Sequence, residues 1–179
     1  AEGARAGERV QAPLPMITGD RDRLMQVVII LISNAVKFTN AGTITGAGFA
    51  LTLDGVGLIS SVASIIGNAS GGVVKNGTGT WTLTGVNTYT GPTVVNAGTL
   101  AVNGTSLPDS SAVTVAAPGT LRLTAAETIG SLAGAGTVTL SSFTLNAGGD
   151  NTSTTFSGLL IGTGALTKAG TGTWLLSGA

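Results

Sequence analysis

The sequence predicts an all-β fold, a right-handed parallel β-helix with about 19 residues per coil, preceded by an N-terminal α-helix as a candidate cap. Three observations carry this prediction. Glycine occupies 29 of the 179 positions, whereas charged residues make up 9% and aromatic residues 4%. Apolar residues, 42% of the chain, occur in alternating runs that are typical of strands. From residue 41 onward, short runs that begin with Gly-Thr recur at similar intervals.

Residues 1–40 differ in composition from residues 41–179, which predicts two parts. Nine of the sixteen charged residues lie before residue 38. Residues 24–38 place apolar side chains at the i, i+3, i+4, i+7 spacing of a buried helix face. The opposite side is apolar too, and the β-branched run Val27–Ile30 leaves a strand as the alternative. A helix that is apolar on most faces is a candidate cap over the first coil near Ile44–Leu53. The alternative is that residues 1–40 are a remnant of a gene fusion.

The region after residue 40 contains five clear strand starts. Their intervals are 19, 21, 17 and 36 residues. Because 36 is close to twice 18, we expect one start to have degenerated near Thr155, within TTFSGLL. A weaker start, GFALTL at Gly48, opens the series. The five clear starts are GTWTL at Gly79, GTLAV at Gly98, GTLRL at Gly119, GTVTL at Gly136 and GTWLL at Gly172.

A period of this size, made of strands and turns without a helix, is typical of a β-solenoid. Its strands stack in parallel from coil to coil at about 4.8 Å, and roughly seven coils fit the region. A parallel coil is expected to be right-handed. An antiparallel β-sandwich, with strands every 8 to 12 residues, is the alternative fold. We expect seven inward-facing residues to form buried columns: Leu83, Leu100, Val102, Leu121, Leu123, Val138 and Leu140.

The corners of such a coil need residues that tolerate positive φ. Glycine does so without steric cost. Asparagine is the next best residue, and its side chain can also hydrogen-bond to the turn backbone. We therefore expect Asn87, Asn96, Asn103 and Asn146 at corners.

Several kinds of chemistry are excluded or disfavoured by composition. The chain has no histidine, which excludes Ser-His-Asp and Cys-His catalysis and most zinc sites. It has no cysteine, so disulfides are excluded. Net charge is zero, which does not favour nucleic-acid binding. The longest apolar run, Val27–Ile32, is too short to span a membrane. We expect no catalytic residue, no cofactor and no metal.

Lone acids in the repeat region suggest one alternative function. Asp54, Asp109, Glu127 and Asp150 together match the residue types of a β-helix enzyme that cleaves polysaccharides. No two of them share a short motif, so we expect them to be solvated turn residues. The accompanying basic residues are Lys75, Arg122 and Lys168. We expect the aromatic residues Trp81, Tyr89 and Trp174 to pack or to cover turns rather than to bind a ligand.

Residues 71–104, GGVVKNGTGTWTLTGVNTYTGPTVVNAGTLAVNG, resemble the autotransporter-associated β-strand repeat of bacterial passenger domains. The pattern returns in KAGTGTWLLSG within residues 168–179, which matches KNGTGTWTLTG at eight of eleven positions, 93 residues away. This resemblance implies a secreted right-handed β-helix on the outer surface of a Gram-negative cell. It also implies a non-enzymatic stalk or display surface with an adhesin-type role.

Residues 19–42, which include GDRDRLMQVVIILISNAVKFTNAG, resemble the N-box of the histidine-kinase ATPase domain. The resemblance implies that Asn34 would bind the magnesium ion of a nucleotide and that Lys37 would lie near its phosphates. The family's earlier asparagine is replaced by Ile30, and no nucleotide-binding glycine box follows. We therefore expect a vestigial segment, with ATP binding as the alternative function.

The resulting expectation is a fragment of an autotransporter passenger that binds a host or surface ligand. It is not expected to bind nucleic acid or to contain a transmembrane segment. The apolar region of a signal peptide does not follow AEGARAGER, so the export signal is absent from these residues. The open ends of the solenoid expose unpaired strand edges, which predicts self-association.

Overall fold

The computed structural model describes residues 43–56 and 59–178. These residues form 18 strands and no helix, which confirms the all-β prediction. They belong to one compact unit, Ala35–Ala179. Within them, no helical segment has the length and apolarity to cross a membrane. The helix expected over residues 24–38 lies outside the described residues.

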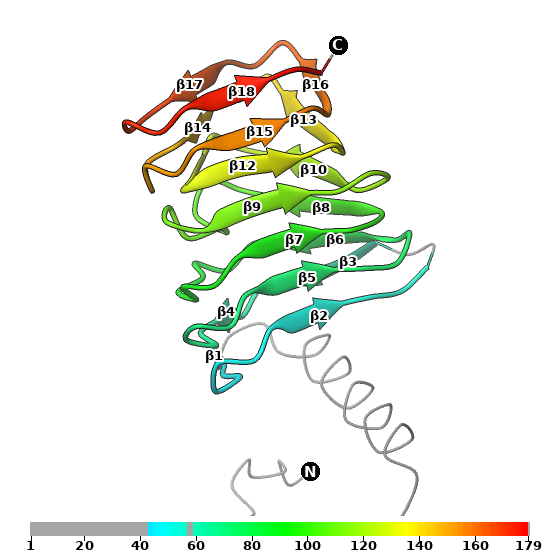
Figure 1. Ribbon diagram of the computed structural model, residues 1–179. Coiled ribbons are helices and arrows are strands. Elements are labelled where there is room, and N and C mark those ends of the chain that lie inside the picture. Colours follow the sequence, from blue (N-terminus) through cyan, green and yellow to red (C-terminus); the bar gives the residue numbers. More distant parts are fainter. Residues whose placement is uncertain (1–42, 57–58, 179) are drawn as a thin grey trace, which may run out of the picture. The chain divides into compact units, whose positions relative to one another are not determined.

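The largest sheet has seven parallel strands, one from each coil. The solenoid therefore has seven coils, as the sequence predicts. In Figure 1 these strands run in the same direction across the near face while the chain rises and returns behind, which is a right-handed coil. The strands are β2 (Leu51–Leu53), β5 (Val73–Lys75), β7 (Thr93–Val95), β9 (Ala112–Val115), β12 (Ser131–Gly134), β15 (Thr154–Phe156) and β18 (Trp174–Leu176).

A six-stranded parallel sheet forms the second face. Each of its strands follows a strand of the first sheet across one corner. The absence of any antiparallel pair among the described strands rules out the β-sandwich alternative. The strands are β3 (Ile59–Val62), β6 (Thr80–Leu83), β8 (Thr99–Val102), β10 (Thr120–Leu123), β13 (Thr137–Ser141) and β16 (Leu159–Gly162).

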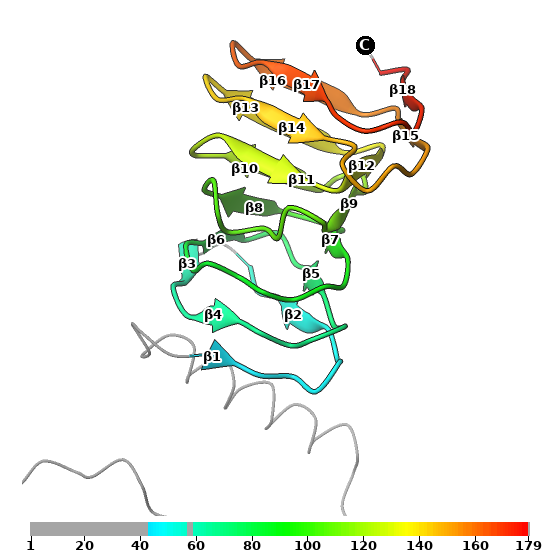
Figure 2. The ribbon, with the colours of Figure 1, turned by 90° about the vertical axis from the view of Figure 1, so that its left-hand side faces the viewer.

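The third face is interrupted. It consists of a two-stranded and a three-stranded parallel sheet. Coils are numbered here by their strand in the seven-stranded sheet, so that coil 3 contains β7 and coil 4 contains β9. Between the two small sheets, coils 3 and 4 cross this face without a strand, at residues 84–92 and 103–111. Figure 2 shows the gap between β4 and β11. The strands of this face are β1 (Thr43–Ile44), β4 (Ile65–Ile66), β11 (Glu127–Ile129), β14 (Leu145–Ala147) and β17 (Leu166–Lys168).

The strand register confirms the predicted period. Paired residues in adjacent coils are separated by as few as 17 positions, from Thr120 to Thr137, and by as many as 22, from Leu51 to Val73. The degenerate start expected near Thr155 is present, because β16 begins directly after the Gly158 of TTFSGLL.

The last member of the predicted series is misassigned. The starts at Gly79, Gly98, Gly119 and Gly136 all lead into the six-stranded sheet, but Gly172 leads into β18 of the seven-stranded sheet. The interval of 36 residues is therefore not two coils. Sequence spacing alone could not reveal this, because every face of the coil uses the same alternation of apolar and polar residues.

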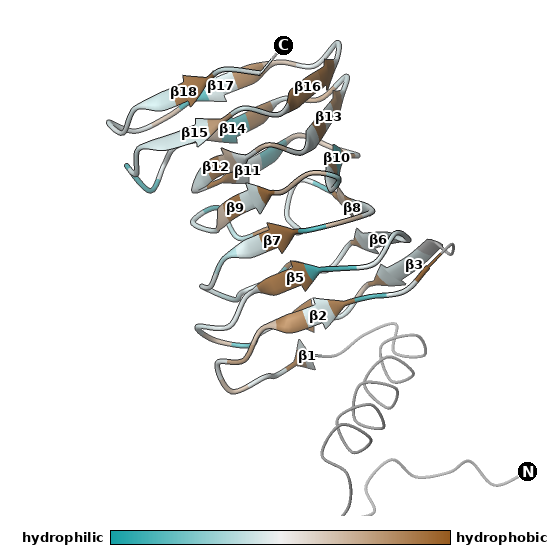
Figure 3. Cartoon of the chain, turned by 45° about the vertical axis from the view of Figure 1, so that its right-hand side comes forward, coloured by the Kyte–Doolittle hydropathy of each residue, from teal (hydrophilic) through white to brown (hydrophobic). Residues whose placement is uncertain are grey.

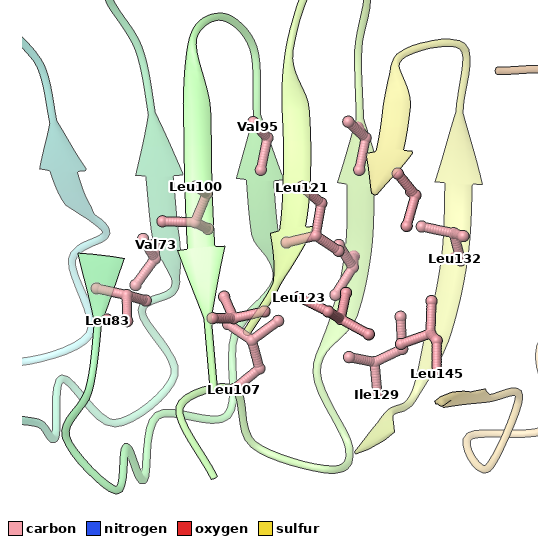
Figure 4. Packing of buried hydrophobic residues seen from close by; sticks show 14 of the residues in the cluster. Val73, Leu83, Val95, Leu100, Leu107, Leu121, Leu123, Ile129, Leu132 and Leu145 are labelled. Atoms are coloured by element: carbon pink, nitrogen blue, oxygen red, sulfur yellow. The ribbon is translucent and has the colours of Figure 1, made fainter. Parts of the chain in front are cut away.

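The core lies inside the coil and is built from columns of stacked aliphatic side chains. Figure 4 shows several of these residues projecting into one interior. Strand pairing places Leu100 beside Leu121 and then Leu121 beside Val138. Complete burial of one such side chain contributes about 1.5–3 kcal/mol. All seven residues predicted to face inward are buried: Leu83, Leu100, Val102, Leu121, Leu123, Val138 and Leu140.

Glycines occupy the tightest corners, as expected. Gly98 has φ +63°, and a Cβ there would lie 2.6 Å from the Gly77 carbonyl oxygen of the preceding coil. The asparagine prediction is wrong in its conformational part. Among the described residues other than glycine, positive φ occurs at Ala47, Ala69, Ser141 and Asn151, so none of the four expected asparagines adopts it.

Candidate functional site

The outward face of the six-stranded sheet carries a column of threonines. Strand pairing aligns Thr80, Thr99, Thr120 and Thr137 directly above one another. Their side chains alternate with buried residues, so they face solvent and are half-buried. This surface presents hydroxyl and methyl groups at the spacing of the coils, about 4.8 Å.

Charge is nearly absent from the outward positions of the described strands, where Arg122 is the one charged residue. Figure 3 shows strands in which brown, apolar stretches alternate with pale ones, and strongly hydrophilic teal is limited to a few places. A surface of this kind has little field to attract a charged ligand over a distance. It suits contact with a neutral partner.

The four acids do not form a catalytic cluster on the surface. Asp54 and Asp109 are exposed, and Asp150 is half-buried in a turn. Burial opposes ionisation of Asp150, but hydrogen bonds from Ser131 and Thr152 outweigh that effect and lower its pKa. Of the other three acids, Asp109 is the one that raises the pKa of Glu127.

Glu127 contradicts the expectation that these acids are solvated, because it is only 1% exposed. It lies beside Leu145 in an inward column that continues to Leu166 in the coil after that. Neither carboxyl oxygen makes a hydrogen bond of good geometry. Burial raises its pKa from 4.5 to about 7, and nearby Asp109 adds to the increase. The Leu107 N–H and the Ser106 hydroxyl oppose the shift only in part. A polysaccharide on the outer surface cannot reach this carboxyl group.

Side chains replace the missing strands at the gap of the third face. The Asn87 side-chain oxygen accepts a hydrogen bond from the Ile66 N–H at 2.7 Å, and its amide nitrogen donates to the Ser106 carbonyl at 2.5 Å. One buried side chain thus joins coil 2 to coil 4. The available sequence signal was the lack of an alternating apolar run in residues 84–92 and 103–111.

Tyr89 lies in the same gap and is fully buried. Its hydroxyl group pairs with the Thr93 hydroxyl at 2.7 Å, and Thr93 pairs with Ser111 at 3.0 Å. Burial raises the pKa of Tyr89 to about 12. Trp81 is also buried, and its indole N–H donates to the Asp54 carbonyl at 2.9 Å. Both aromatic residues therefore pack, as predicted, instead of forming a ligand-binding surface.

Lys75 is a buried cation at a corner of the coil. It lies in an inward column between Leu53 and Val95, and it is 0% exposed. Its ammonium group donates to the carbonyls of Asn76, of Gly77 at 2.8 Å and of Ala97 at 3.1 Å. Burial lowers its pKa, against the opposing effect of Asp54. The first two carbonyls belong to its own corner and the third to the next coil, so Lys75 fastens two coils together.

Lys168 occupies the same place in the second copy of the repeat. Its ammonium group donates to the carbonyls of Ala169 at 3.1 Å and Gly170 at 2.9 Å. Lys168 is exposed, unlike Lys75. Trp174, the counterpart of Trp81, has an indole N–H without an acceptor among the described residues.

The remaining predictions concern cofactors. The described residues contain no group of three or more acidic, cysteine or histidine side chains placed to hold a metal ion. The kinase-like residues Asn34 and Lys37 lie outside the described residues.

Comparison with known proteins supports the resemblance to passenger repeats. The family "Passenger-associated-transport-repeat" matches residues 73–102 and 166–179, in agreement with the two predicted copies and not with the kinase-like segment. The "Adhesin BmaC autotransporter" of Brucella suis biovar 1 (strain 1330) is 37% identical over 171 residues. That alignment covers 84% of this chain, but the chain spans only 5% of the length of that relative. No solved structure matches the chain.

Lys75→Met is expected to lower the free energy of unfolding by about 1–3 kcal/mol, because it leaves three partly buried carbonyls without their donor. Lys168→Met is the matched control and should change it by no more than about 0.5 kcal/mol, as expected of an exposed residue. Urea denaturation followed by circular dichroism measures both. Equal effects of the two substitutions would contradict the role assigned to Lys75.

Glu127 makes stability depend on pH. Its folded-state pKa is raised from 4.5 to about 7, so the folded chain binds the proton more tightly than the unfolded chain. The contribution of Glu127 to the free energy of unfolding is therefore at its full value below pH 4.5. It is lost as the pH rises through 7, and the total loss is about 3 kcal/mol. Denaturation midpoints between pH 5 and 8 should show this loss.

Glu127→Gln keeps the size of the side chain and removes its titration. The variant should be more stable than the original chain at pH 8, and the difference should shrink towards pH 5. A Glu127→Gln variant with the same pH profile as the original chain would show that another group causes the dependence.

Proposed function

We propose that this chain is a segment of a surface-exposed adhesin-type passenger of a Gram-negative bacterium, exported by the autotransporter route. Within that passenger it acts as a stalk or display surface and performs no catalysis. The proposal is supported by the two passenger repeats and by the similarity to an autotransporter adhesin.

The observation that carries the proposal is the continuous parallel pairing of seven coils around a filled interior. Each added coil lengthens such a solenoid by about 4.8 Å and covers the core of the coil before it. The side chains of the aliphatic columns fill the interior. This construction suits a stiff spacer that holds other parts of a passenger away from the cell.

The distribution of polar groups also favours a non-enzymatic role. A glycosidase needs two accessible carboxyl groups at a fixed separation on one surface. Here Glu127 faces the interior, and Asp54 and Asp150 lie in turns of different coils. We propose that contact with a host or surface ligand is made by other parts of the passenger, which this segment holds away from the cell.

A bead assay tests the stalk role. Because the chain has no cysteine, one cysteine added after Ala179 couples it to beads in a single orientation. Beads that carry the chain alone should bind cultured epithelial cells no better than albumin-coated beads. A short ligand-binding peptide at the N-terminus should capture its ligand faster on the chain than when it is coupled directly to the bead.

Gly72→Val is the control variant, in which stacking of adjacent coils is disrupted. A Cβ at Gly72 would collide with the Pro92 carbonyl oxygen of the next coil, and this variant should lose the advantage in capture. Saturable binding of cells by the chain alone, inhibited by free chain, would show that the segment makes the adhesive contact itself.

A further inference from the structure

Coils 4 and 5 are not joined by strand pairing on the third face. Strand β11 of coil 5 is an edge strand that pairs with β14 of the coil after it, while segment 103–111 of coil 4 forms no strand. The Thr124 N–H donates to the Val102 carbonyl at 2.8 Å on one side of this stretch. The Gly130 N–H donates to the Ser111 carbonyl at 2.9 Å on the other. Between these two bonds, side chains have to hold coil 4 against coil 5.

Glu127 lies in this stretch, and its carboxyl group lacks suitable donors. The residue is 1% exposed, and both of its carboxyl oxygens are buried without a hydrogen bond of good geometry. A carboxylate can only accept hydrogen bonds, so in the interior it needs donors, a proton or a cation. Instead, a second acid, Asp109, acts on it through its charge. Two carboxyl groups from adjacent coils therefore lie near one another.

Further oxygen atoms lie around the same position. The Ser106 hydroxyl accepts a hydrogen bond from the Asn103 N–H at 2.8 Å, and it also approaches the Glu127 carboxyl group. The side-chain oxygen of Asn103 is buried and has no donor. Asp109 is exposed and so connects this group of residues to solvent. Buried oxygens that find no donor in the protein indicate an ion or a water molecule that satisfies them.

The chemistry of these oxygens favours calcium. Carboxylate and amide oxygens are ligands of hard divalent cations, and two carboxylates balance the charge of one such ion. Ca²⁺ accepts six to eight oxygens in irregular geometry, whereas Mg²⁺ requires a nearly ideal octahedron and keeps several of its waters. The irregular backbone of segment 103–111 suits the less demanding ion. Water that enters beside the exposed Asp109 can complete its coordination.

We infer that Glu127, Asp109 and Asn103 form a calcium site that joins coil 4 to coil 5 across the interrupted third face. Glu127 supplies the buried carboxylate, Asp109 the solvent-facing carboxylate and Asn103 a side-chain oxygen. The ion would do for coils 4 and 5 what the Asn87 side chain does for coils 2 and 4. With two charged ligands, we expect a Kd of about 0.1–1 mM, the range of weak extracellular calcium modules.

Calorimetric titration of the full chain with Ca²⁺ tests the site directly. It is done in metal-free buffer at pH 8, above the pKa of about 7 that Glu127 has without the ion. We expect saturable binding of one ion. At about 10 mM Ca²⁺ the melting temperature should rise by about 3–6 °C, and backbone amides of segment 103–111 should exchange hydrogen more slowly. Mg²⁺ at the same ionic strength should give less than about half of that rise.

Terbium luminescence locates the ion. Tb³⁺ occupies calcium sites and emits when a nearby aromatic side chain is excited. Tyr89 is the only tyrosine in the chain, it is buried, and the charge of Glu127 acts on its hydroxyl group. We expect sensitised emission that excess Ca²⁺ removes. Tyr89→Phe should lower this emission without weakening calcium binding, and unchanged emission in this variant would place the ion elsewhere and overturn the inference.

Three substitutions identify the ligands. Glu127→Gln keeps the size of the buried side chain, and Asp109→Asn alters an exposed residue that the fold does not need. Each should weaken calcium binding by about tenfold or more, because each removes a charged ligand. Asp54→Asn is the matched control, since it makes the same change of charge at an exposed acid of coil 1, and it should leave the affinity unchanged. A titration without saturable heat would overturn the inference. So would equal stabilisation by Ca²⁺ and Mg²⁺, or an affinity that survives Glu127→Gln.

Discussion

Parallel hydrogen bonding between successive coils is the constraint on which the structure depends. A single coil has unpaired backbone groups on both edges and an apolar interior open at both ends, so it gains stability only from its neighbours. The close pairing of β5 with β7 and of β6 with β8 fixes the distance between coils. That distance in turn sets which side chains stack. The aliphatic columns, the threonine column and the glycine corners all follow from the same register.

Two inward-pointing charged residues are compatible with this register for different reasons. Lys75 lies at the end of its strand, where its side chain reaches the carbonyls of two adjacent corners. Its ammonium group donates hydrogen bonds to these carbonyls in place of water. Glu127 lies at the start of β11, next to the segment 103–111 that forms no strand, and its carboxyl oxygens find no comparable set of donors. The lysine therefore strengthens the contact between coils, and the glutamate makes that contact sensitive to protonation.

The sequence allowed the fold class, the number of coils and the seven inward residues to be predicted, because alternation and period are local signals. It did not allow the third face to be predicted. There, the side-chain amide of Asn87 makes the hydrogen bonds between coils that a strand would otherwise make. It joins Ile66, 21 positions earlier, to Ser106, 19 positions later. Asn87 was expected at a corner with positive φ, yet the structure uses its hydrogen-bonding groups instead. Glu127 was expected in solvent because nothing in the sequence around it shows which residues of the preceding coil cover it.

The misassignment of Gly172 has a physical cause that also explains the repeat. The 93 residues between the two copies do not return the chain to the same face, because they are not a whole number of coils: five coils lead from Lys75 to Leu176. What the two copies conserve is a corner: a lysine at a strand end, a glycine turn and the start of the next strand. Such a corner needs only its own two carbonyls and the edge of the next coil. It can therefore recur on any face without disturbing the stack, and its spacing along a chain reflects corners rather than whole coils.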